Sequence, residues 1–326
     1  MKDEEIYSLR LQELLDLGAS SQYFNHLSDS TLALCSNLAI DDKQQILNHF
    51  NQLWLPTALN LAAARNQLDR TLIQGILGGQ GTGKTTLCQI LKLILNYLGF
   101  AVATLSIDDL YLTYKQRQVL QQQDPRLIWR GPPGTHDVDL GLKIIEQCLS
   151  DTATEILLPR FDKSAFNGAG DRTTPEAITK PDILLFEGWF VGVQPITEDC
   201  FSNPPTPIAT SEDIQFAKDN NQRLKAYLPL WDKLDSLIIL YPENYRFSKQ
   251  WRKEAEHKMM DTGKLGMSDK ECDRFVEYFW KALHPELFIK PLIQTANIVV
   301  EIKGDRTLGK IYQTFDSNFR RTIGHT

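Results

Sequence analysis

The stretch "TLIQGILGGQGTGKTT" (residues 71–86) decides the fold, because it joins an apolar run to a glycine-rich turn and the start of a helix. Its second half fits the pattern G-x-x-x-x-G-K-[ST], from Gly78 to Thr85. Glycines allow backbone angles at which successive N–H groups point inward, and a helix that begins at Lys84 adds its positive end. We therefore predict a loop that binds the phosphates of ATP. Its predicted residues are Gly79, Gln80, Gly81, Thr82, Gly83, Lys84, Thr85 and Thr86.

From residue 70 onward, short apolar runs alternate with helical stretches. The predicted strands are residues 71–77, 100–107, 181–188, 234–241 and 296–302, and the clearest predicted helices are 84–98 and 137–149. Such alternation predicts βαβ units and right-handed crossovers. The expected fold is a three-layer α/β/α domain with a mostly parallel five-stranded sheet. In this class, ligands bind at the carboxyl ends of the strands.

The chain divides into a predicted helical extension, residues 1–69, and a main domain, residues 70–326. Apolar residues at helical spacing in 41–68 support the extension, and Pro56 is expected to kink or divide its helix. Within the main domain we predict a hairpin or loop insertion at 150–180, a long surface loop at 194–213 and a lid at 245–271. Gly263 and Gly266 would form the mobile end of that lid.

Composition excludes several function classes. The 326 residues carry a net charge of −6, which favours neither nucleic acid nor an anionic membrane as a partner. No secretory signal and no apolar run of membrane-spanning length is found. The five cysteines are scattered and lack metal-ligand spacing, so we expect reduced thiols in a cytoplasmic protein. The sequence does not fix the oligomeric state.

Acidic residues end two of the predicted strands. Asp108 and Asp109 follow the second strand, and Glu187 ends the third. If the third strand lies beside the first, Glu187 and the Thr85 hydroxyl reach a Mg²⁺ ion, while Lys84 reaches the β- and γ-phosphates. Asp108 would then face the γ-phosphate as a base for an acceptor hydroxyl. The alternatives are a turn or cap role for the aspartates and a supporting role for Glu187.

Five motifs in a fixed order extend this interpretation: "SIDDLY" (106–111), "RGPPGTHD" (130–137), "PRFDKSAFNGAGDR" (159–172), "FEGWFVG" (186–192) and "WRKEAEHKM" (251–259). Together they resemble the D-glycerate 3-kinase family, within the wider group of P-loop kinases that includes uridine kinase, phosphoribulokinase and pantothenate kinase. The resemblance implies ATP-dependent phosphorylation of D-glycerate to 3-phosphoglycerate, the closing step of photorespiration. It also implies that Asp108 and Lys84 are catalytic, that Thr85 and Glu187 serve Mg²⁺, and that Arg252 in the lid reaches the phosphates. The segment 279–292 departs from the expected pattern, which leaves open how the acceptor side is closed.

A small carboxylate acceptor requires cations, preferably a bidentate arginine, and partners for its hydroxyls. The candidate substrate-binding residues are Asp108, Arg130, His136, Asp137, Arg160, Lys163 and Arg172. Asp137 could instead cap the following helix, His136 could be an ordinary loop histidine, and Lys163 and Arg172 could be surface charges. Competing functions are a kinase for another acceptor, such as uridine or pantothenate, and a P-loop ATPase without an acceptor.

Overall fold

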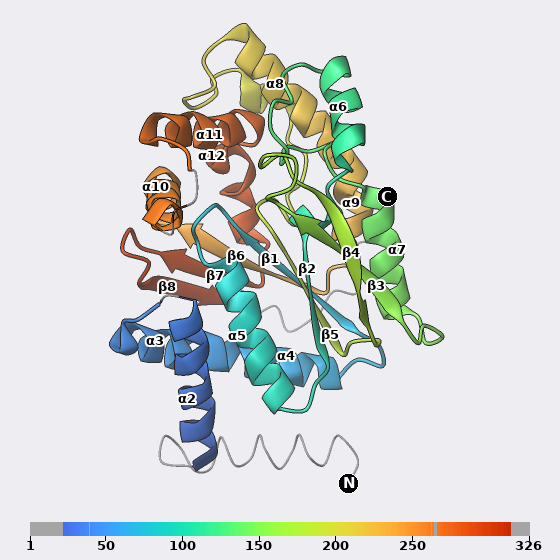
Figure 1. Ribbon diagram of the computed structural model, residues 1–326, viewed down its shortest axis with the longest axis vertical. Helices are drawn as coiled ribbons and strands as arrows, with labels where there is room; N and C mark the ends of the chain where they lie inside the picture. Colours follow the sequence, from blue (N-terminus) through green and yellow to red (C-terminus); the bar gives the residue numbers. More distant parts are fainter. Residues whose placement is uncertain (1–21, 39, 262, 264–265, 314–326) are drawn as a thin grey trace.

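The computed structural model describes residues 22–38, 40–261, 263 and 266–313 (Figure 1). The part of the predicted helical extension in residues 1–21 lies outside this range. None of the helices within the described residues is long and apolar enough to cross a membrane.

A six-stranded sheet in the order β2-β5-β1-β6-β7-β8 forms the centre of the molecule. Its strands are β1 (Leu72–Gly78), β2 (Val102–Ser106), β5 (Ile183–Gly188), β6 (Ser236–Pro242), β7 (Ile298–Ile302) and β8 (Leu308–Gln313). The first five run parallel and confirm the five predicted strands, whereas β8 is antiparallel to β7. The predicted count of five was therefore one strand short. The run "LGKIYQ" of β8 has too few apolar residues to be recognised, since it lies at the edge of the sheet.

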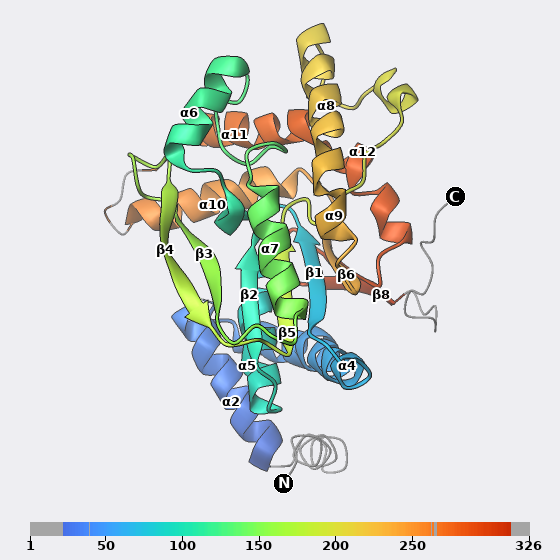
Figure 2. The ribbon, with the colours of Figure 1, turned by 90° about the vertical axis from the view of Figure 1, so that its right-hand side faces the viewer.

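Helices cover both faces of the sheet, which confirms the three-layer α/β/α fold (Figure 2). One face is covered by α2 (Gln22–Asn37), α3 (Lys43–His49), η2 (Phe50–Trp54), α4 (Leu55–Asn66) and α5 (Lys84–Tyr97). The other is covered by η3 (Ile107–Leu110), α7 (Val138–Leu149), α8 (Ser211–Arg223), η5 (Leu224–Tyr227), α9 (Leu228–Trp231) and α12 (Pro285–Phe288). Strand β1 serves both cores, since Leu72 and Ile76 join the first and Ile73 and Leu77 the second.

The N-terminal helices share a core with the sheet. Residues 43–66 are helical throughout, and Phe50–Trp54 form one wide π-helical turn directly before Pro56. Proline has no N–H to donate to the preceding turn, so a change in helical pitch at this point relieves the conflict. Phe50, Leu53 and Trp54 are buried in the same cluster as α5.

The predicted insertion is an antiparallel hairpin of β3 (Ile156–Asp162) and β4 (Asp171–Ile178), which forms a sheet of its own. Its turn, residues 163–170, lies next to α6 (Tyr114–Gln123) in Figures 1 and 2. The predicted surface loop at 194–213 ends earlier than expected. Thr210 and Asp213 form a capping box that begins α8. The loop also contains the short helix η4 (Glu198–Phe201) and buries Phe201 and Ile208.

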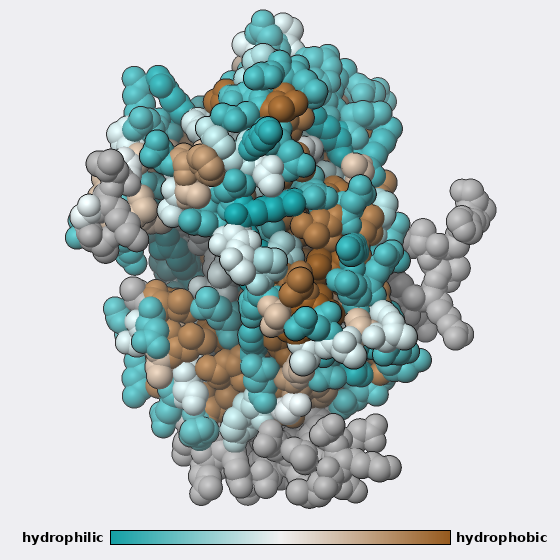
Figure 3. Space-filling view, turned by 45° about the vertical axis from the view of Figure 1, so that its right-hand side comes forward, coloured by the Kyte–Doolittle hydropathy of each residue, from teal (hydrophilic) through white to brown (hydrophobic). Residues whose placement is uncertain are grey.

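Among the described residues, four helical segments follow β6 and precede β7 in the chain. These are α10 (Phe247–Asp261), α11 (Asp269–Ala282), the short α12 and η6 (Pro291–Gln294). The predicted lid comprises α10, the following turn and the first residues of α11. Within that turn, residues 262 and 264–265 are outside the described range, so mobility of the lid end stays a prediction. On the face drawn in Figure 3, the upper part is largely hydrophilic, and apolar side chains come to the surface in the middle and lower parts.

Candidate active site

The phosphate-binding loop follows β1 and ends where α5 begins. Gly81 and Gly83 have φ angles of 78° and 89°, a left-handed conformation that glycine adopts without strain. The Thr82 hydroxyl donates to the Gly79 carbonyl at 2.9 Å, and Lys84 Nζ donates to the same oxygen at 3.1 Å. The first-turn N–H groups of α5 have no partner within their helix, so the loop presents donors and a positive helix end to an anion.

The loop is covered on one side by α10. Trp251 of this helix is buried, and its indole N–H donates to the Gly304 carbonyl at 2.9 Å. A Cβ atom on Gly81 would lie 2.5 Å from Trp251 Cβ, so the two backbones can approach only because residue 81 is glycine. Arg252, the next residue, pairs with Glu256 and lies over the Phe275 ring at 4.8 Å. Its predicted contact with phosphate stays a prediction.

Gly81→Ala should destabilise the nucleotide-free protein more than Gly83→Ala. Both substitutions put alanine at a left-handed position, which costs roughly 1–2 kcal/mol. A Cβ at residue 83 meets nothing within 4 Å, whereas at residue 81 it collides with Trp251. We expect the collision to lower the free energy of unfolding by about 1–3 kcal/mol more. Urea unfolding of both variants measures the difference, and equal losses would show that Trp251 does not pack tightly on the loop.

Glu187 is the last residue but one of β5, which lies between β2 and β1. Its carboxylate is largely buried and accepts a hydrogen bond from the Thr85 hydroxyl at 3.2 Å. The predicted neighbourhood of the third and first strands is thus confirmed, with Ile76 of β1 and Ser106 of β2 as the register partners of Glu187. Two adjacent oxygen ligands beside a phosphate loop fit Mg²⁺, which takes one or two protein oxygens and the phosphates of its substrate.

The two aspartates after β2 have different surroundings. Asp109 accepts the Ser106 N–H at 3.0 Å in the capping box of η3 and pairs with Arg160 at 3.0 Å. Asp108 pairs with Lys163 of the hairpin turn at 2.6 Å, and its side chain is 27% exposed. The turn and cap role therefore belongs to Asp109. Asp108 is the aspartate that remains to contact a ligand at the carboxyl ends of the strands.

The charge state of Asp108 is set by its neighbours. Burial alone would raise the pKa of this carboxyl, but the Lys163 ammonium and a hydrogen bond from the Tyr111 hydroxyl outweigh it. The pKa of Asp108 consequently lies below its ordinary value, and the group is an anion at neutral pH. An ionised carboxylate at this position can accept a proton.

Lys163→Met should move the acid limb of the pH profile of kcat/KM to higher pH. The Lys163 charge helps to hold the pKa of Asp108 down, so its removal raises that pKa, and a larger fraction of Asp108 is protonated at acidic pH. Lys180→Met, which removes a cation paired with Asp151 at the far end of the hairpin, is the matched control and should leave the limb in place. Coinciding limbs for Lys163→Met and the parent would mean that Asp108 does not govern the acid limb.

The other predicted acceptor residues lie nearby, but most have partners within the protein. Asp137 caps α7 and pairs with Arg172 at 2.8 Å, so its cap role and its charge pair coexist. Arg160 pairs with Asp109 and Glu176. Arg130 donates to the carbonyls of the hairpin turn, and buried His136 hydrogen-bonds the Tyr227 hydroxyl at 2.8 Å.

Several known proteins are similar to this chain in sequence, although no family model matches it. The chloroplastic D-glycerate 3-kinase of Arabidopsis thaliana is 33% identical over 230 residues, which make up 67% of this chain and 48% of that protein. The "Uncharacterized kinase mug58" of Schizosaccharomyces pombe is 32% identical over 219 residues, which make up 64% of this chain and 79% of that protein. The chain belongs to the P-loop kinases related to D-glycerate 3-kinase.

A solved structure supports the same family. The D-glycerate 3-kinase from Cryptococcus neoformans var. grubii has a TM-score of 0.70 at 27% identity, with 78% of this chain and 96% of that chain covered. The chain spans about half the length of the plant kinase, 48%.

Sequence reasoning assigned no role to three side chains that the fold brings to the site. Trp251 opens the motif at 251–259, Tyr227 precedes the fourth predicted strand, and Arg117 lies in the polar helix α6. In the structure Arg117 donates to the carbonyls of Ala169 and Gly170, at 2.8 Å and 2.5 Å. These contacts join segments more than 50 residues apart, so local pattern carries no signal for them.

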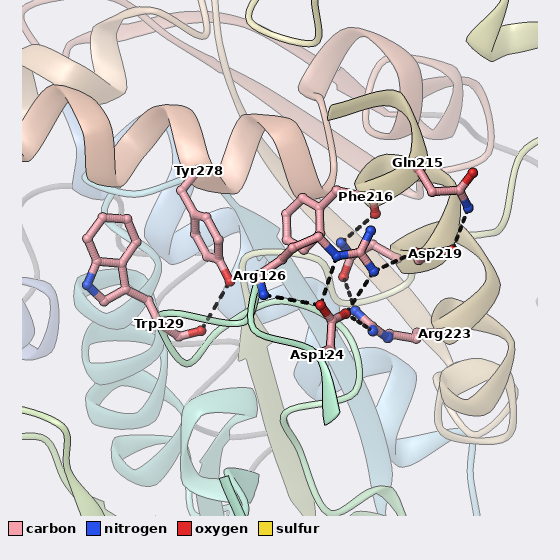
Figure 4. Close-up of polar contacts among 9 residues, drawn as sticks. Asp124, Arg126, Trp129, Gln215, Phe216, Asp219, Arg223 and Tyr278 are labelled. Carbon is pink, nitrogen blue, oxygen red and sulfur yellow. Dashed lines mark hydrogen bonds and ion pairs between the residues drawn. The ribbon is translucent and has the colours of Figure 1, made fainter. Parts of the chain in front are cut away.

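A cluster of charged residues holds the segment that carries Arg130 and His136 (Figure 4). Asp124 accepts from Arg126 at 2.8 Å and from Arg223 of α8 at 2.5 Å, and Arg126 also pairs with Asp219 of α8. Hydrogen bonds from Arg126 and Arg223 hold the pKa of Asp124 well below its ordinary value despite partial burial. The cluster therefore fixes the start of the segment to α8.

The segment 279–292, which departs from the family pattern, also packs on the segment that carries Arg130 and His136. A Cβ on Gly131 would lie 2.2 Å from the Phe279 ring, and that ring packs against Trp189 with centroids 5.1 Å apart. Gly131 has a φ of 132°, which other residues rarely adopt. The aromatic side chain of Phe279 thus backs the loop that precedes His136.

Proposed function

We propose that the protein transfers the γ-phosphoryl group of ATP to D-glycerate and releases 3-phospho-D-glycerate and ADP. One observation carries the proposal: the Asp108 anion lies on the same sheet edge as the phosphate loop, with cations beside it. A small acidic acceptor fits these cations better than a nucleoside, which would need an apolar or base-stacking surface.

In the proposed reaction, Asp108 accepts the proton of the acceptor hydroxyl as that oxygen forms its bond to the γ-phosphorus. The bond from the γ-phosphorus to the bridging oxygen breaks, and ADP leaves with the electron pair. Lys84 stabilises negative charge on the β- and γ-phosphates. The loop N–H groups hold the phosphates in line, and α10 with Trp251 shields the loop from water.

The Thr85 and Glu187 oxygens are proposed to hold Mg²⁺, with Glu187 acting partly through water. When bound, the ion would neutralise charge on the β- and γ-phosphates. Arg252 is proposed to join the phosphates when its pairing with Glu256 opens.

A coupled assay of ADP release tests the acceptor, with D-glycerate, uridine, pantothenate and ribulose 5-phosphate in parallel. We expect rapid release with D-glycerate and slow release with water alone. Turnover with another acceptor and none with D-glycerate would overturn the named substrate. Rapid release without any acceptor would favour a P-loop ATPase, which would then need a water-positioning group and an arginine from a partner.

The family resemblance also suggests a metabolic role for the proposed reaction. The reaction would be the closing step of photorespiration in a photosynthetic organism. The five cysteines are free thiols, four of them buried, which supports a proposed cytoplasmic location.

A further inference from the structure

Two buried side-chain nitrogens near Asp108 have no hydrogen-bond partner within the described residues: Arg117 Nη1 and His136 Nε2. A buried donor without a partner costs about 1–3 kcal/mol, so such groups are rare unless a ligand uses them. His136 is 6% exposed. Among the described residues, neither side chain has a hydrogen bond or ion pair with Lys84 or the phosphate loop.

An aromatic pair connects these two donors. Tyr111 stacks on His136 with ring centroids 4.6 Å apart and contacts the Phe161 ring edge-on at 5.0 Å. The guanidinium groups of Arg117 and Arg130 lie over the same Phe161 ring, at 5.2 Å and 5.4 Å from its centroid. Two arginines and one histidine therefore share a single aromatic support.

Neither Arg117 nor Arg130 forms an ion pair within the part of the chain that the structure describes. Their partners are three backbone carbonyls of the hairpin turn, those of Gly168, Ala169 and Gly170. A carboxylate presents two oxygens in a plane and makes hydrogen bonds roughly twice as strong as neutral carbonyls do. The carbonyls thus occupy donors that an acidic ligand would bind better.

Tyr227 contacts the other ring nitrogen of His136. The Tyr227 oxygen accepts the Gly134 N–H at 2.8 Å, and it lies 2.8 Å from His136 Nδ1, to which its own hydrogen can be donated. In that arrangement Nδ1 is the acceptor, and Nε2 carries the ring hydrogen. Burial lowers the pKa of His136 to about 3, and the ring is neutral at physiological pH.

We infer that Arg117, Arg130 and the Nε2–H group of His136 together bind the carboxylate of the acceptor, and that Tyr227 is a positioning residue that keeps the hydrogen on Nε2. This inference rests on the proposed function and deepens it. The acceptor displaces the turn carbonyls from the two arginines. The tip of the turn is exposed at Phe166, Asn167 and Gly168, so it can move without opening a core, at the cost of the Phe166 stack on Tyr114.

Kinetics with matched acceptors test the carboxylate contact. The ratio of kcat/KM for D-glycerate to that for glycerol, which lacks the carboxylate, should fall by about 10- to 100-fold in Arg117→Met. Arg130→Met should lower the same ratio, and the KM for ATP should stay at the parent value in both. Lys115→Met removes an exposed cation from the same helix and is the control.

Turnover with glycerol shows whether a variant has merely disturbed the hairpin turn. If Arg117 only holds the turn, its loss would lower kcat/KM for D-glycerate and for glycerol equally. The ratio would then be unchanged, and the inference would be overturned. Arg117→Lys keeps the charge without the guanidinium fork, so it should show a smaller loss of the same kind even if Arg117→Met folds poorly. A raised KM for ATP with an unchanged ratio would assign the arginines to phosphate and overturn the carboxylate site.

The outcome for the parent separates this inference from the proposed function. If the parent phosphorylates another hydroxy acid, the named substrate is wrong, and the ratio is measured with that acid and its alcohol. If it uses D-glycerate but Arg117→Met keeps the ratio, the function stands and the inference is wrong. A parent that accepts neutral acceptors alone overturns both.

Nitrogen-15 NMR of labelled histidine tests the tautomer independently of activity. The parent should show an unprotonated Nδ1 and a protonated Nε2 for His136, assigned with His136→Gln. In Tyr227→Phe the Nδ1 signal should shift, and the KM for D-glycerate should rise about three- to tenfold with kcat little changed. A protonated Nδ1 in the parent would overturn the assigned role of Tyr227.

Discussion

Asp108→Asn is expected to lower kcat with D-glycerate by about 10²- to 10⁴-fold and to leave the affinity for ATP unchanged. The substitution keeps the size of the side chain and removes its ability to accept a proton. Since Asp108 lies at the end of β2 and has no contact with the phosphate loop in the described hydrogen bonds and ion pairs, nucleotide binding should not depend on its charge. Steady-state kinetics and nucleotide titration measure the two effects.

Asp109→Asn is the matched control for this prediction. Asp109 belongs to the capping box of η3 and pairs with Arg160, so its loss should act mainly on stability. We expect a lower melting temperature and a much smaller change in kcat than for Asp108→Asn. If Asp108→Asn turns over like the parent, or the two variants exchange these roles, Asp108 is not the base.

Lys84→Ala is expected to lower turnover by about 10²- to 10³-fold with any acceptor. The Lys84 ammonium is placed by its bond to the Gly79 carbonyl at the mouth of the loop, where the β- and γ-phosphates would lie. Its removal should also weaken ATP binding, because no other basic side chain is proposed to contact the phosphates while Arg252 is paired with Glu256.

Lys92→Ala removes a cation from the same helix at a position away from the loop and should behave like the parent. The two Lys variants, measured with D-glycerate and with water as acceptors, test the phosphate loop separately from the acceptor. Unchanged turnover in Lys84→Ala would exclude the loop as the ATP site.

The central fold could be predicted because each parallel strand is a short apolar run, buried on both faces. The glycine loop, Glu187 and the Asp108–Asp109 pair follow such runs directly, so the position of each along its strand was readable. Strand β8 was not, because an edge strand with polar residues lacks that contrast. The π-helical turn before Pro56 also needs the structure, since proline marks the place of a pitch change without fixing its form.

The acceptor side could be predicted only as a group of residues. Sequence reasoning found Arg130, His136 and Lys163 in motifs, yet it could not tell which cations have protein partners. Arg160 is committed to Asp109, 51 positions away, while Arg117 bears no motif at all. Side-chain pairing across the hairpin decides which hydrogen-bond donors stay free. That pairing depends on distances in the folded structure, which the spacing of residues along the sequence does not give.

Trp251 packs between the phosphate loop and residues 303–307, the turn between β7 and β8. No sequence motif marks this turn. Its backbone side presses on Gly81, while its indole is fixed by the Gly304 carbonyl and covered by Arg306, whose guanidinium lies 5.5 Å from the ring centroid. Arg306 in turn pairs with Glu254 of α10. The turn between β7 and β8 therefore fixes the side chain that packs on Gly81. We expect a change in that turn to alter ATP affinity, because it would shift the Trp251 indole.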